Sequence, residues 1–153
     1  MTIGDELKLI RDEFNKTKLK WAVAGSAAIS IHAMYTTKKS RSPRNIDIMI
    51  HKDNRQVLVD KMIFLGYELI QTKTSRSNIR FERRGKTPVN LLLITGQFHP
   101  VVYEKIPVLS LQTLINMKKE QNKSSNNLHA MQNILNARRH WHSFMRNLIP
   151  NIN

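Results

Sequence analysis

Two apolar segments of the chain each carry a single polar residue in their interior. Residues 46–50 read Ile-Asp-Ile-Met-Ile, and residues 89–94 read Val-Asn-Leu-Leu-Leu-Ile. Runs of this length and composition are typical of strands in the interior of a sheet, most of all the second. A polar side chain in such a strand needs a partner, because burying it alone costs free energy. The two segments therefore predict a sheet-based fold in which Asp47 and Asn90 require an explanation.

The rest of the sequence alternates between helical and strand patterns. Helix starts are predicted at Gly25-Ser26, at Asp53 as an N-cap and at Ser110 as an N-cap, with Gly66 ending the helix that Asp53 begins. In that helix, Val57, Leu58, Met62 and Leu65 are expected to face inward. We predict helices over 5–17, 27–35, 54–65, 111–117 and about 126–148, and strands over 21–24, 46–50, 67–71, 79–83, 89–94 and 106–109. This order predicts an α/β fold, a mixed sheet flanked by helices with a further helix at the C-terminus.

The length of 153 residues suits one domain, with a core over about 18–120 and a C-terminal helical segment over about 122–150. No apolar run approaches the roughly 20 residues that cross a bilayer, and the acidic start does not resemble an export signal. There is no cysteine. We therefore expect a cytoplasmic protein with no membrane partner.

The charge of the chain is strongly positive. Its 25 Lys and Arg against 11 Asp and Glu give +14, and no acid follows Glu120. Such a surface attracts polyanions, which points to nucleotides or RNA as partners. The alternative is that an A/T-rich genome has enriched lysine and asparagine without a functional reason.

The segments before Asp47 have a distinctive order: strand, Gly-Ser, helix, basic loop, then the strand bearing the acid. Residues 21–35 read WAVAGSAAISIHAMY, and residues 40–50 read SRSPRNIDIMI. This order resembles the polymerase beta-like nucleotidyltransferase superfamily, particularly its small bacterial members. There, Asp-x-Asp lies on the second strand and a third acid on a later one, where this chain has GKTPVNLLLI. The resemblance continues into PVLSLQTLINMKKE and spans roughly residues 18–135.

The resemblance implies transfer of a nucleoside monophosphate from an NTP to a hydroxyl of RNA, protein or a small molecule. Gly25 and Ser26, at a helix N-terminus, would bind phosphate, because free backbone N–H groups attract anions there. Arg41, Arg44 and Arg80 would bind nucleotide or phosphate. The catalytic and metal-binding positions would be Asn45, Asp47 and Asn90, with Mg²⁺ as the cofactor.

The chain departs from the family at two of its three metal-binding acids. Asn45 and Asn90 keep the size of aspartate but bring no charge, so the site carries −1 where the family has −3. Each lost ion contact is worth about 4 kcal/mol at 4 Å and an effective dielectric near 20, before desolvation. The alternative function is therefore a pseudoenzyme that binds nucleotide, nucleic acid or a protein partner. The resemblance allows that partner to be of the toxin–antitoxin kind.

Simpler roles remain open for each residue at this stage. Ser26 could be an ordinary N-cap, and Asn90 a satisfied core amide. Asp47 could pair with Arg41, Arg44 or Arg80 instead of a metal ion. The basic loop that holds Lys38, Lys39, Arg41 and Arg44 could be solvated.

Overall fold

The computed structural model describes residues 3–37, 42–70, 77–121 and 131–138. Its centre is a mixed sheet with the strand order β3-β4-β5-β2-β1-β7-β6, which confirms the predicted α/β class. The pairs β2–β5 and β1–β7 are parallel, and the other neighbours are antiparallel. The strands are β1 (Trp21–Ala24), β2 (Ile46–His51), β3 (Glu68–Ile70), β4 (Asn78–Glu82), β5 (Val89–Ile94), β6 (Val101–Tyr103) and β7 (Ile106–Val108).

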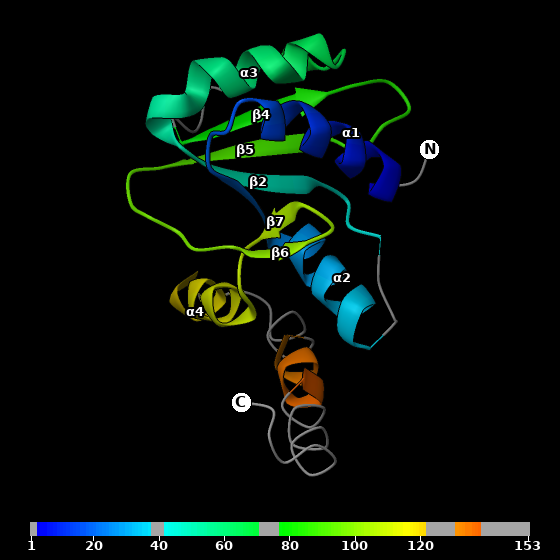
Figure 1. The fold of residues 1–153 in the computed structure, drawn as a ribbon, viewed down its shortest axis with the longest axis vertical. Helices are drawn as coiled ribbons and strands as arrows, with labels where there is room; N and C mark the ends of the chain where they lie inside the picture. The colour runs from blue at the N-terminus through cyan, green and yellow to red at the C-terminus, as the bar shows by residue number, and fades with distance from the viewer. Residues whose placement is uncertain (1–2, 38–41, 71–76, 122–130, 139–153) are drawn as a thin grey trace.

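The helices are α1 (Ile3–Lys16), α2 (Gly25–Thr36), α3 (Arg55–Phe64) and α4 (Leu111–Gln121). Residues 131–138 are also helical, inside the C-terminal helix that the sequence predicts. The remainder of that predicted helix lies outside the described residues. Helix α1 contacts α3, and α2 contacts α4 (Figure 1). Within the described part of the chain, no helix has the length and apolar character to cross a membrane.

The two faces of the sheet differ in chemistry. Trp21 of β1 pairs with Ile50 of β2, and its ring meets Phe14 of α1 edge-on at 5.3 Å. Because side chains alternate along a strand, Ile46, Ile48 and Ile50 share this fully buried face. Asp47 therefore points to the opposite face, away from Phe14.

Three predictions about the elements need correction or completion. Asp53 is not the N-cap of α3, because residues Lys52–Asn54 form a short 3₁₀ turn and Asn54 occupies the cap. Val57 is 46% exposed and does not face inward. Strand β6 was not predicted, because its two valines lie on an exposed sheet edge next to a turn. The predicted cap at Ser110 is correct, since its Oγ accepts the N–H of Thr113.

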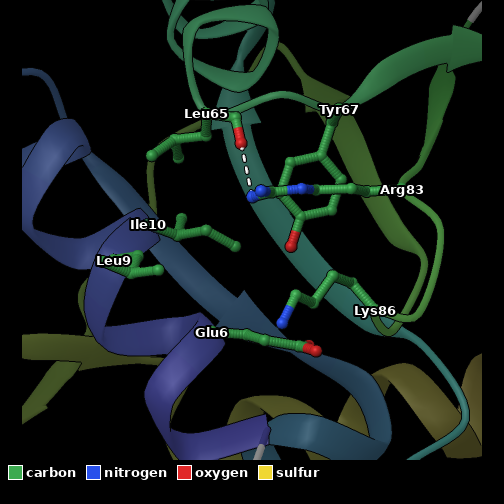
Figure 2. Close-up of a pocket in the computed structure, with 7 residues that line it drawn as sticks. All are labelled: Glu6, Leu9, Ile10, Leu65, Tyr67, Arg83 and Lys86. Carbon is green, nitrogen blue, oxygen red and sulfur yellow. Dashed lines mark hydrogen bonds between the residues drawn. The ribbon is translucent and has the colours of Figure 1, made fainter. Parts of the chain in front are cut away.

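A buried carboxylate ties α1 to the turn between β4 and β5. Both oxygens of Glu6 lie 3.2 Å from the backbone N–H of Thr87, and the residue is 4% exposed. Figure 2 shows Glu6 beside Tyr67, Arg83 and Lys86, around a cavity of about 10 Å³. Burial, followed by the charge of Glu6, raises the pKa of Tyr67. A cavity of this size holds about one water molecule, so we assign it a packing role.

Replacing Glu6 by alanine should lower the free energy of unfolding by about 1–3 kcal/mol. The reason is that the partly buried Thr87 N–H would lose its acceptor. Urea denaturation monitored by the fluorescence of Trp21 and Trp141 measures the change. Glu68→Ala, at an exposed position of β3, is the matched control and should change stability little. An equal loss in both variants would contradict the assigned role of Glu6.

Helical residues 131–138 are joined to α2 through a buried histidine. His32 is fully buried, with Nε2 at 2.7 Å from the Leu109 carbonyl and Nδ1 at 2.9 Å from the Tyr103 hydroxyl. Arg138 donates to the Tyr103 hydroxyl and lies 3.1 Å from His32 Nδ1. Since a carbonyl only accepts, Nε2 carries the proton and Nδ1 accepts one. The neutral ring therefore connects α2, β6 and the link between β7 and α4 to the C-terminal segment.

This connection should weaken in acid. Burial lowers the pKa of His32 below its usual 6.5; the Leu109 carbonyl opposes this effect and the charge of Arg138 adds to it. As the pH falls below 6.5, the unfolded chain binds a proton at this histidine before the folded one does, so the free energy of unfolding decreases. Denaturation between pH 5 and pH 8 (about the range in which histidine titrates) should show this loss, and His32→Gln should reduce the slope. An unchanged slope would contradict it.

Candidate active site

Three neighbouring strands place a row of polar side chains on the face opposite Phe14. In the pairing of β2 with β5, Asp47 lies across from Asn90. In the pairing of β5 with β4, Asn90 lies across from Arg80. Directly paired residues project to the same face, so Asp47, Asn90 and Arg80 are adjacent there. Asn45 immediately precedes β2, and its Oδ1 accepts a hydrogen bond from Arg80, so it lies beside this row.

Gly25 lies against the Asp47 carboxylate at the point where β1 becomes α2. Ala24, the last residue of β1, pairs with Asp47, and Gly25 follows with φ +58°. A Cβ at Gly25 would stand 2.6 Å from Asp47 Oδ2, closer than real Cβ contacts come. The position thus requires glycine for its left-handed backbone and for the space beside the carboxylate. This contact brings the first turn of α2 to the acid on β2.

Ser26 lies inside the first turn of α2 and is exposed. Ala24 occupies the N-cap, and no side chain caps the helix, so the reading of Ser26 as an ordinary N-cap is wrong. The first N–H groups of a helix have no partner within the helix and carry a partial positive charge. Through Gly25, these N–H groups lie next to the Asp47 carboxylate.

Asp47 is held by an amide. Asn90 Nδ2 donates to Asp47 Oδ1 at 3.0 Å, and Asn90 is 8% exposed. Because an ionised carboxylate only accepts, the Nδ2 end of the amide must face it. Asn90 is therefore a satisfied buried amide, one of the two roles that the sequence allowed for it. It also lies beside the other residues of the candidate site. In the described part of the chain Asp47 forms no ion pair, so the pairing with Arg44 or Arg80 is wrong; Arg41 lies outside that part.

Arg80 reaches Asn45 across the sheet. Its Nη1 donates to Asn45 Oδ1 at 3.4 Å, and its Nε lies 2.9 Å from Glu82 Oε1 on the same strand. Arg44 is exposed immediately before Asn45, while Lys38, Lys39 and Arg41 lie outside the described residues. Glu82 was not among the predicted site residues. The sequence feature that could have identified it is its position two residues after Arg80, which puts both side chains on one face of β4.

The donor set fits one Mg²⁺ ion and not two. Mg²⁺ in nucleotide sites is commonly held by one or two carboxylates together with substrate phosphates and water. Asp47 supplies one carboxylate, with Oδ2 in the space that a Cβ at Gly25 would fill. Asn90 turns an N–H toward Asp47, and the oxygen of Asn45 accepts from the Arg80 cation. No group of three Asp, Glu, His or Cys side chains that could hold a metal occurs among the described residues.

No protein-family model matches the sequence, and no curated protein matches it. Solved structures do match the fold. The lincosamide antibiotic adenylyltransferase LnuA, in its lincomycin-bound structure, aligns with a TM-score of 0.69 at 17% identity, over 87% of this chain and 96% of that one. ANT(2")-Ia, in complex with adenylyl-2"-tobramycin, aligns with a TM-score of 0.64 at 11% identity, over 92% of this chain and 99% of that one.

A putative nucleotidyltransferase from Thermotoga maritima is a third match, with a TM-score of 0.56 at 15% identity, over 89% of this chain and 96% of that one. The chain therefore has the polymerase beta-like nucleotidyltransferase fold, and the resemblance predicted from its sequence motifs is confirmed at the level of fold. At these identities the likeness establishes the fold alone. What the chain does with it depends on the site around Asp47.

Proposed function

We propose that this chain binds a nucleoside triphosphate beside Asp47 and transfers its nucleoside monophosphate to a hydroxyl group of an acceptor. The observation that carries the proposal is the contact between Gly25 and Asp47, which places the first turn of α2 against a carboxylate on β2. Such a pairing suits a ligand that has both a phosphate chain and a bound cation. The adenylyltransferase LnuA and ANT(2")-Ia, which share the fold, support the same reaction class.

The residues of this chain would each have a defined part. The N–H groups at the start of α2 and the Ser26 hydroxyl would bind phosphate oxygens, with Arg44 and Arg80 adding positive charge. Asp47, together with the phosphates, would hold Mg²⁺, and Asn90 would fix the orientation of the Asp47 carboxylate. When bound, the metal supplies charge stabilisation for the phosphates during transfer. Arg41 is assigned a phosphate-binding role on its sequence position alone.

The acceptor is expected to be anionic. A chain of net charge +14 repels cationic small molecules and attracts RNA at low salt. We therefore propose RNA, such as a transfer RNA, as the acceptor. Gel-shift titration at low and moderate salt should show affinity that falls steeply as salt rises. No affinity for RNA even at low salt would remove this choice of acceptor and leave nucleotide binding untouched.

The direct test combines binding with turnover. Calorimetric titration of ATP, GTP, CTP and UTP in Mg²⁺ should reveal binding of at least one nucleotide, and incubation with that labelled nucleotide and RNA should release pyrophosphate. Asp47→Asn should abolish the Mg²⁺-dependent part of both signals, because the remaining carboxylate of the site is lost. Asp60→Asn on α3, away from the site, is the charge-matched control. Absence of binding, or equal behaviour of the two variants, would contradict the proposal.

A second function is favoured by one specific observation, the replacement of two acids by Asn45 and Asn90. With one carboxylate, the site could bind nucleotide or a partner without transferring anything. Nucleotide binding accompanied by no pyrophosphate release, with any acceptor tested, would favour this binding role. A protein partner, as in a toxin–antitoxin pair, would then be the next candidate.

A further inference from the structure

The Arg80 side chain lies beside two positions, 45 and 90, that carry metal-binding acids in the family this chain resembles. Arg80, Asn90 and Asp47 are consecutive partners across β4, β5 and β2. The guanidinium reaches Asn45, the first position of the motif that is Asp-x-Asp in the family it resembles. A positive side chain and a second divalent cation at this place would repel each other. The site is thus arranged around a built-in cation.

The guanidinium is anchored and still accessible. Its contacts with Asn45 and Glu82 engage two of its five N–H donors. The side chain of Arg80 is 32% exposed and that of Glu82 is 49% exposed, so water screens their ion pair. Exposed pairs of this kind are weak and can yield to a stronger anion. A phosphate group, which guanidinium binds with two parallel hydrogen bonds, is such an anion.

The neutral residues around Arg80 make it available. Aspartates at positions 45 and 90 would surround the guanidinium with carboxylates and neutralise it. Asparagine at both positions leaves two carboxylates near Arg80. Asn90 engages that of Asp47 by a hydrogen bond, and that of Glu82 is 49% exposed to water. The two asparagines and the arginine together therefore suit a site that binds an anion directly.

We propose that Arg80 takes the place of the second metal ion and binds a phosphate group of the nucleotide directly, in the absence of any divalent cation. This inference rests on the proposed function for the identity of the site. It differs from that function in its need for a metal ion. Phosphate binding by Arg80 needs no metal, whereas nucleotide binding at Asp47 does. Phosphate binding at this site should therefore persist in a chelator.

The experiment is calorimetric titration of inorganic pyrophosphate into the full chain in EDTA. Arg80→Gln should weaken binding at least about tenfold, the loss expected for a charge-assisted hydrogen bond. Arg84→Gln removes the same charge from an exposed turn after β4 and is the matched control, expected to stay within about twofold. Arg80→Lys keeps the charge but not the planar guanidinium, so its affinity for pyrophosphate should lie between those of the unchanged chain and Arg80→Gln. Thermal unfolding by circular dichroism verifies that each variant is folded.

Three results would overturn the inference: no pyrophosphate binding in EDTA, equal loss in Arg80→Gln and Arg84→Gln, or full affinity in Arg80→Gln. Titration of the preferred nucleotide with Mg²⁺ on the same proteins separates the two proposals. Mg²⁺-dependent nucleotide binding without pyrophosphate binding in EDTA would overturn the role of Arg80 and leave the proposed function standing. Arg80-dependent pyrophosphate binding without any nucleotide transfer would support the role of Arg80 and contradict transfer.

Discussion

Replacing Gly25 by alanine is expected to abolish nucleotide binding and to lower the free energy of unfolding by about 2 kcal/mol. Two causes combine in this variant. The left-handed backbone at φ +58° costs an L-residue about 1–2 kcal/mol, and the new Cβ would meet Asp47 Oδ2 at 2.6 Å. Relief of that clash must move either the carboxylate or the first turn of α2. Both belong to the proposed phosphate and metal contacts.

The variant Gly85→Ala separates the two causes, because it introduces backbone strain without a clash. Gly85 has φ +73°, and a Cβ there would meet nothing within 4 Å. This variant should lose stability from backbone strain alone and keep its nucleotide affinity. Urea denaturation and calorimetry on both variants measure the two effects. If Gly25→Ala binds nucleotide as well as Gly85→Ala does, the contact between α2 and Asp47 has no part in the site.

Restoring the two acids, in the double variant Asn45→Asp/Asn90→Asp, should raise Mg²⁺-dependent nucleotide affinity at least about tenfold. Two added carboxylates increase the attraction for a divalent cation, although desolvation offsets much of the Coulomb energy. The same variant should lose binding of pyrophosphate in EDTA, because a carboxylate at position 45 would pair with Arg80. Metal dependence and metal-free binding should therefore change in opposite directions.

The single variant Asn90→Asp should show, in the absence of metal, how a second carboxylate beside Asp47 affects stability. It would exchange an N–H donor, now 3.0 Å from Asp47, for a second carboxylate, and stability should fall by about 2 kcal/mol at neutral pH. Adding Mg²⁺ should recover that stability. Asn116→Asp on the exposed surface of α4 is the control for charge alone. A Mg²⁺ response equal in Asn90→Asp and Asn116→Asp would contradict a metal site at this position.

The sequence allowed the fold to be predicted and the residues of the candidate site to be singled out, because both steps depend on local patterns. The apolar runs with Asp47 and Asn90 define two strands, and Gly25-Ser26 marks the turn into α2. Alternation predicts Asn45 and Asp47 on one face, although Asn45 lies just before β2 and is placed by its hydrogen bond with Arg80. The inward direction of Val57 was wrong because it depends on how α3 sits on its neighbours, which periodicity within one helix does not specify.

Partners across the sheet could not be derived in the same way. The hydrogen bond from Asn90 to Asp47 and the approach of Arg80 to Asn45 both depend on strand order and register, which join segments 35 and 43 residues apart. The sequence indicated that Asp47 needs a partner, and several cations were candidates. The register of β2 against β5 shows that this partner is the amide of Asn90. The link from Arg138 to His32, 106 residues apart, was likewise absent from every local pattern.

The register that aligns positions 47, 90 and 80 is specified by the apolar residues of these strands that fill the core, such as Ile46, Ile48 and Ile50, and not by the polar side chains in the row. Exchange of an amide for a carboxylate at positions 45 and 90 therefore alters the charge of the site and leaves its frame in place. Codons for asparagine and aspartate differ by one base, so each position lies a single mutation from the alternative state. Under the proposed role of Arg80, a gene of this kind would exchange metal-dependent for metal-free phosphate binding, in either direction, by two single-base changes that leave the sheet intact.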